Sequence, residues 1–398
     1  MTETEFPESK ALRHDPRALA LLLAASLTVM AAATISPALP GLERQFPDTA
    51  ANAWLIRLLV PAPSLAVILT AALCGIAAER IGRRPLLLTG ITLFALAGSA
   101  GLVLQDLNHM LASRLVLGVA LALIMTAQSA LLGDYFSGAA LHALSGAQVA
   151  ARNFGGFAFI TLAGALASLS ARLPFAIYAL PTLVLPFMAR AITEPPRRIR
   201  GDRIATDPAA APGWGLGVGL LSLGQMLVTT IFFTMPTQLP FYLEVRGYAE
   251  PALTGAVLGV LMIAGGISAL FYPRLRARIG NLGNWAIGLA LMALGFALLV
   301  SGSDIATIGT AAAAIGAGYA LTIPGFTALS LQHSPAHRRG TMAAMLTASV
   351  FLGQFLSPLL SIPAIAHWGW QASGLGLAGL LAAAALVPAA FALRSGRS

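Results

Sequence analysis

Hydrophobic positions in this chain fall into long blocks, and polar positions are concentrated in the short segments between them. Roughly twelve blocks contain about 20 or more mostly apolar residues, the length that a helix needs to cross the hydrocarbon core of a bilayer. Prolines inside the blocks do not argue against helices, because neighbouring membrane helices satisfy the freed backbone groups. The pattern predicts an all-α membrane protein with twelve transmembrane helices, at residues 18–40, 53–78, 85–104, 109–133, 143–169, 173–191, 214–240, 251–273, 283–301, 305–330, 341–366 and 370–392.

Composition and charge agree with this interpretation. The chain has 398 residues, of which 57% are hydrophobic and 10% charged, whereas a soluble domain is about 25% charged. If the N-terminus is cytoplasmic, 18 of the 24 Lys and Arg residues lie on the cytoplasmic side, three on the opposite side and three within spans. Cytoplasmic loops of membrane proteins carry such an excess. We therefore expect a multi-pass protein of a bacterial inner membrane with both termini in the cytoplasm, and no nucleic-acid partner despite the net charge of +9.

The longest polar connection, residues 192–213, is rich in proline and arginine and separates six predicted spans from six. The halves share a short repeat, because Arg80–Gly82 returns as Arg278–Gly280, 198 positions later, and Gly156 corresponds to Gly353 at a similar offset. These features predict two pseudo-symmetric six-helix bundles around a central cavity. The expected domains are a cytoplasmic tail at 1–17, the N-terminal bundle at 18–191, the linker at 192–213, the C-terminal bundle at 214–393 and a cytoplasmic tail at 394–398.

A compact charged segment between the second and third predicted spans, residues 75–84, carries the clearest motif, and we call it the charged turn. Its motif positions are Gly75, Glu79, Arg80, Gly82, Arg83 and Arg84. The segment resembles the signature G-x-x-x-D-R-x-G-R-R/K of the major facilitator superfamily, with Glu79 in place of the usual aspartate. In the fourth span, Arg114 and Gly118 resemble the R-x-x-x-G of that family.

The resemblance implies a secondary-active transporter that works by rocking two bundles around a central cavity. It also implies that Asp134, at the cytoplasmic end of the fourth span, lies near Glu79 and Arg83, and that this charge cluster latches one conformation. The expected gating residues are Gly75, Glu79, Arg80, Gly82, Arg83, Arg84 and Asp134. The alternative is that Arg80, Arg83 and Arg84 are only topology anchors.

The sequence of the fifth span indicates which branch of the superfamily this chain most resembles. Drug/proton antiporters usually carry G-P-x-x-G-G there, and residues 151–156 read Ala-Arg-Asn-Phe-Gly-Gly. The paired glycines, Gly155 and Gly156, are present, whereas the Gly-Pro is absent. Together with Pro37 and Pro40, the motif set still most resembles the 12-span drug-efflux branch.

Three arginines within the spans mark candidate positions of a substrate pathway, because a charge in the bilayer core costs at least about 2.5–3.5 kcal/mol. Arg114 shares a helix face with Gln128, and Arg152 shares one with Gln148. Arg57 lies near a span end, where it can snorkel outward. The candidate cavity residues are Arg114, Gln128, Gln148, Arg152, Asn153, Gln225, Tyr319, Gln354 and Arg57.

Acidic residues are missing from the interior of every predicted span. A cavity with arginines and no carboxylate favours an anionic, zwitterionic or carbonyl-rich substrate. The alternative is that Glu43, Asp48 or Asp106 neutralises Arg57 and Arg114; Arg152 has no acid close to it in sequence.

The first functional hypothesis is proton-coupled export of a small amphipathic compound by alternating access. The alternative is transport of an organic anion, such as a carboxylate-rich metabolite or siderophore, and a non-transporting receptor or scaffold is least favoured. We expect a monomer in the lipid bilayer with a small-molecule substrate. We expect no enzymatic activity, because no nucleophile–base constellation for hydrolysis stands out in the sequence. We expect no cofactor and no use of ATP, because the chain has no GxxxxGK[ST] pattern, and the proton gradient is the expected energy source. We expect no metal, because His333 and His337 lack a supporting carboxylate or cysteine.

Overall fold

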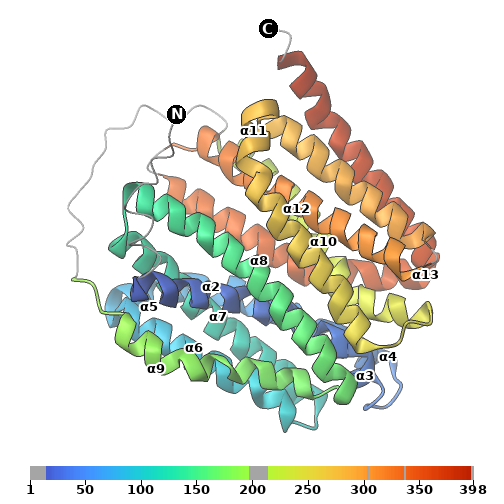
Figure 1. The fold of residues 1–398 in the computed structure, drawn as a ribbon, viewed down its shortest axis with the longest axis horizontal. Coiled ribbons are helices and arrows are strands. Elements are labelled where there is room, and N and C mark those ends of the chain that lie inside the picture. The colour runs from blue at the N-terminus through green and yellow to red at the C-terminus, as the bar shows by residue number, and fades with distance from the viewer. Residues whose placement is uncertain (1–14, 197–213, 303, 336–337, 396–398) are drawn as a thin grey trace, which may run out of the picture. The chain divides into compact units, whose positions relative to one another are not determined.

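The computed structural model describes residues 15–196, 214–302, 304–335 and 338–395, and every regular element in these ranges is helical (Figure 1). Most of the predicted N-terminal tail (1–17) and of the linker (192–213) lies outside the described residues, as do His337 and the end of the 394–398 tail. The chain divides into two compact units, residues 1–198 and 199–398. Each unit is described below by itself.

The described part of the first unit begins at Asp15. The Asp15 carboxylate caps helix α2, and Pro16 follows at the first helical position. Its α-helices are α2 (Pro16–Ala33), α3 (Leu39–Glu43), α4 (Ala50–Leu58), α5 (Ala62–Ile81), α6 (Arg83–Ser99), α7 (Leu107–Tyr135), α8 (Gly138–Leu169) and α9 (Pro181–Ala191). Short 3₁₀ helices are η1 (Ser36–Ala38), η2 (Ala100–Leu102) and η3 (Leu173–Ala179). Helix α2 packs on α8, α7 packs on both α5 and α6, and α6 also contacts α9.

The second unit consists of α10 (Trp214–Val245), α11 (Pro251–Ser301), α12 (Ile305–His333) and α13 (Arg339–Ser395). Helix α11 packs on α12 and α13, and α10 packs on α13. Two of these helices are interrupted by glycines with non-helical backbone, Gly280 (φ 71°) in α11 and Gly369 (φ 76°) in α13. Positive φ is a conformation that glycine adopts without strain.

Ten helical stretches in the described ranges are long and apolar enough to cross a membrane. The interrupted helices α11 and α13 contain 51 and 57 residues, more than twice the roughly 20 residues that one crossing needs. Counting each as two crossings makes the ten stretches consistent with twelve passes. The chain is an all-α, multi-pass membrane protein.

Two predicted spans are less regular than expected. The span predicted at 53–78 breaks at residues 59–61, between α4 and α5. Pro61 and Pro63 explain the break, because proline lacks the amide hydrogen and its ring clashes with the preceding turn of a helix. The span predicted at 18–40 passes from α2 through η1 into α3, where Pro37 and Pro40 occur.

The internal repeat extends from the sequence into the backbone. Gly82 and Gly280, 198 positions apart, both have positive φ, 109° and 71°. Asp106 and Asp304 have the same separation, and each caps a helix by accepting from the backbone N–H three residues later, on α7 and α12.

Close helix contacts repeat at the same separation. A Cβ on Gly118 would collide with the carbonyl oxygen of Pro63, and one on Gly316 would collide with that of Leu261. Gly316 lies 198 positions after Gly118, and Leu261 lies 198 positions after Pro63. The pairing predicted between Gly156 and Gly353 needs a correction of one residue. Gly155, which packs on Ser26 of α2, is the counterpart of Gly353, which packs on the Met226 carbonyl of α10.

Candidate functional site

The charged turn is built around Gly82, which ends α5 and precedes α6 with φ 109° and ψ 160°. The carboxylate of Glu194 accepts two backbone hydrogen bonds there, from the N–H of Arg83 at 2.8 Å and from the N–H of Arg84 at 2.7 Å. The first N–H groups of a helix have no partner within the helix and attract negative charge. Glu194, just beyond the end of α9, therefore caps α6.

Arginine side chains of the charged turn connect α6 to two further helices. Arg83 forms an ion pair with Asp134 at the end of α7. The guanidinium of Arg84 donates to the carbonyl of Ala189 on α9 at 2.9 Å. Glu79 and Arg80 lie in the exposed last turn of α5. Gly75 makes no close helix contact, because a Cβ there would meet nothing within 4 Å.

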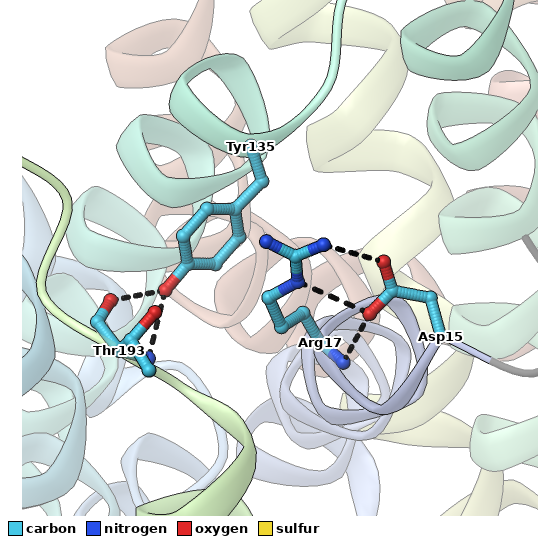
Figure 2. Close-up of polar contacts among 4 residues, drawn as sticks. All are labelled: Asp15, Arg17, Tyr135 and Thr193. Atoms are coloured by element: carbon cyan, nitrogen blue, oxygen red, sulfur yellow. Dashed lines mark hydrogen bonds and ion pairs between the residues drawn. The ribbon is translucent and has the colours of Figure 1, made fainter.

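A second set of contacts, shown in Figure 2, joins the ends of α2, α7 and α9. The Tyr135 hydroxyl donates to the carbonyl of Thr193 and accepts from its N–H. The Arg17 guanidinium lies over the Tyr135 ring, 5.2 Å from its centroid, and pairs with Asp15 at 3.0 Å. These contacts tie Thr193, just beyond the end of α9, to the end of α7 and, through the Tyr135 ring, to the start of α2.

The Asp15 carboxylate caps α2 and titrates below its ordinary range. Burial alone would raise the pKa of Asp15, but the hydrogen bonds from Arg17 outweigh burial and lower it. A lowered folded-state pKa adds stability above the ordinary pKa of aspartate, and this stability is lost as the pH falls through the lowered value.

Arg114 lies on α7 and is fully buried inside the first unit. Its guanidinium lies 4.9 Å from the ring centroid of Phe175 and 4.8 Å from that of Tyr178. It also donates to the carbonyl of Gly98 on α6. The predicted role in a substrate cavity is therefore not visible in this arrangement, where aromatic rings and backbone carbonyls enclose the charge.

Arg57 has an acidic partner. Its guanidinium pairs with Glu43 at 2.9 Å, as the neutralisation hypothesis allowed. Asp106, which the same hypothesis offered as a partner, instead caps α7 and contacts His109 at 2.9 Å. No carboxylate contacts Arg114 within the described part of the chain.

Arg152 and Gln148 lie one turn apart on α8, and both carry buried N–H groups without an acceptor. These groups are the Nε of Arg152 and the Nε2 of Gln148. The amide of Asn153 donates to the carbonyl of Val149 in its own helix, at 2.9 Å. Gln128 on α7 is 2% exposed, and its Oε1 has no donor.

The candidates of the second unit gather on α10, α12 and α13. Gln225 donates to the carbonyl of Leu346 at 3.3 Å, and the hydroxyls of Thr229 and Tyr319 lie 3.3 Å apart. The Tyr319 ring stacks on Phe232 with 3.9 Å between centroids. Gln354, on α13, is buried. Gln225, Thr229 and Phe232 follow one another at i, i+4 and i+7, so they form one face of α10.

The sequence profile described as Major Facilitator Superfamily matches residues 21–358, which is most of the chain. The chain belongs to the Major Facilitator Superfamily. Membership in this superfamily makes the protein a membrane-embedded transporter of small molecules and not an enzyme. No curated protein is a significant match in sequence.

Solved structures of Major Facilitator Superfamily transporters share the fold. A D-xylose-proton symporter has a TM-score of 0.75 at 17% identity, covering 92% of this chain and 96% of the symporter. The nucleoside transporter NupG has a TM-score of 0.73 at 15% identity, covering 95% and 99%. The human organic anion transporter MFSD10 (TETRAN) has a TM-score of 0.66 at 19% identity, covering 94% and 98%.

Sequence reasoning missed the residues that hold the charged turn of this superfamily member in place. Glu194 lies about 110 positions from the backbone that it caps, and Tyr135 and Thr193 are 58 positions apart. No local pattern links such residues. The one available signal was an acidic residue at the end of the sixth span, directly before Pro195 and Pro196.

Glu194→Ala is expected to destabilise the first unit by about 0.5–1 kcal/mol, because it leaves two N–H groups of α6 without their acceptor. Glu194→Gln should lose less, since an amide oxygen can still accept one of the two bonds. Thermal unfolding of the purified variants in detergent measures both effects. Equal stability of Glu194→Ala and wild type would contradict the cap.

Proposed function

We propose that this transporter is a proton-coupled exporter of a small amphipathic compound in a bacterial inner membrane, with both termini in the cytoplasm. The ion pair between Arg83 and Asp134 is the observation that carries the proposal. It joins α6 to α7 through side chains that are 31% and 16% exposed. A partly solvated pair is weak enough to open and strong enough to bias two states that differ by a few kcal/mol.

The packing of α8 supports the export branch. Gly155 approaches α2 so closely that a Cβ on it would lie 2.7 Å from the Cβ of Ser26. Gly155 of the paired glycines thus allows tight packing although Arg152 occupies the position of the proline in the antiporter motif. Small residues at such contacts let membrane helices approach each other.

Flux in proteoliposomes tests the proposal. Purified protein is reconstituted, a pH gradient is imposed, and accumulation of a panel of amphipathic fluorescent compounds is recorded. We expect accumulation on the acidic side that collapses when nigericin removes the gradient. Substrate flux that ignores the gradient would overturn proton coupling, and absence of flux for the whole panel would overturn export of such compounds.

The second candidate is transport of an organic anion, and Arg152 favours it. Arg57 is paired with Glu43, and Arg114 is enclosed by two aromatic rings. Arg152 therefore remains as the intramembrane cation whose charge no contact described here offsets. The same proteoliposomes distinguish the candidates, since an anion transporter moves carboxylates in preference to neutral and cationic compounds.

A further inference from the structure

Two unsatisfied donors lie on one face of α8. Gln148, Arg152 and Gly155 are separated by four and three residues, so they share a face. Gly155 packs on Ser26, which places this face along α2. The buried Nε2 of Gln148 and Nε of Arg152 both lack an acceptor there. Buried polar groups without partners are rare in folded proteins, and each needs an explanation.

Neighbouring hydroxyl groups on α2 do not satisfy these donors. Ser26 donates to the carbonyl of Leu23 at 2.7 Å, and Thr28 donates to that of Ala25 at 2.8 Å. Neither accepts a hydrogen bond from Arg152 or Gln148 in the described contacts. Gln148 is 8% exposed, so water does not freely replace its missing acceptor.

The position of Arg152 excludes a lipid headgroup as the acceptor. It lies 14 residues after the first residue of α8 and 17 before the last, which is about 21 Å and 26 Å along the axis. The residue is therefore near the middle of the helix, further from either end than an arginine side chain can reach.

We propose that Arg152 and Gln148 bind the carboxylate of the transported compound. A guanidinium and an amide offer convergent N–H donors, and a carboxylate is the acceptor that also offsets the charge. The inference rests on the proposed function only in assuming that the chain binds a small molecule for transport. It names the chemical group by which that molecule is held.

Thermal-shift measurements in nanodiscs test the site with acetate, benzoate, 4-phenylbutyrate, its amide and 4-phenylbutylamine. Carboxylates should raise the apparent Tm of the wild type more than the amide does, and the amine should not raise it. Arg152→Met should abolish the carboxylate shift, and Gln148→Leu should reduce it. Arg152→Lys should keep part of the shift, because it keeps the charge without the planar donor geometry.

Arg152→Met should also stabilise the ligand-free protein, whereas replacing a residue with a purely structural role would destabilise it. Replacing a half-buried charge, whose Nε is buried without an acceptor, by an apolar side chain should raise the apparent Tm of the ligand-free protein by roughly 2–5 °C. The matched control is Arg190→Met, at an exposed arginine of α9, which should change neither the ligand-free Tm nor the carboxylate shift.

Several outcomes overturn the site. They are a lower ligand-free Tm in Arg152→Met, an unchanged carboxylate shift in that variant, no shift with any carboxylate at millimolar concentration, or equal binding of the amine.

Measurements of flux in proteoliposomes distinguish failure of the carboxylate site from failure of the proposed function. A carboxylate that binds through Arg152 but ignores the pH gradient would overturn proton-coupled export alone. Gradient-driven export of an amine, unchanged by Arg152→Met, would overturn the site alone.

Discussion

Asp134→Arg is expected to lower the rate of transport about tenfold or more while leaving substrate affinity within about threefold of wild type. The substitution replaces the partner of Arg83 by a second positive charge at the end of α7. Under the proposed gating role the ion pair stabilises one conformation, so its loss should shift the balance between conformations rather than the contacts of the substrate. Initial rates in proteoliposomes give the turnover, and thermal shift gives the affinity.

The swapped pair provides the decisive control. Arg83→Asp combined with Asp134→Arg restores opposite charges, and we expect it to recover most of the rate that either single variant loses. Arg190→Gln removes an exposed positive charge of α9 and should leave the rate unchanged. Equal losses of turnover and affinity in Asp134→Arg would show misfolding instead of an altered conformational balance.

The fold was largely predictable because a bilayer imposes strong constraints on sequence. Blocks of about 20 apolar residues revealed the helices, and the repeat of Arg80–Gly82 at Arg278–Gly280 is matched by positive φ at Gly82 and Gly280. The break at residues 59–61 was missed, because membrane helices tolerate proline and hydropathy alone does not show which proline interrupts a helix.

The environment of individual charges was less predictable. Helix spacing placed Arg114 and Gln128 on one face, but it could not show that Phe175 and Tyr178, more than 60 positions away, enclose the guanidinium. The pairing of Arg57 with Glu43 was available as a hypothesis because the two lie 14 positions apart. The cap that Glu194 forms depends on tertiary packing of α9 against α6, which periodicity does not specify.

Gly118→Ala is expected to lower the apparent Tm by more than about 5 °C, because the added methyl group would overlap the carbonyl oxygen of Pro63. That oxygen belongs to the backbone of α5, so it can move only if the helix moves. Gly133→Ala is a matched control on the same helix, since a Cβ there would meet nothing within 4 Å. It should be neutral or slightly stabilising, because alanine favours a helix over glycine by about 1 kcal/mol.

The repeat extends this prediction to the second unit. Gly316→Ala should destabilise the protein as Gly118→Ala does, because the same overlap arises with the carbonyl of Leu261 on α11. Gly309→Ala, on α12 with open space around its Cβ, is the corresponding control. Losses in the double variant Gly118→Ala with Gly316→Ala should add, since each contact lies within its own unit. If Gly118→Ala and Gly316→Ala have the same apparent Tm as Gly133→Ala and Gly309→Ala, the duplicated fold does not require the close helix contact.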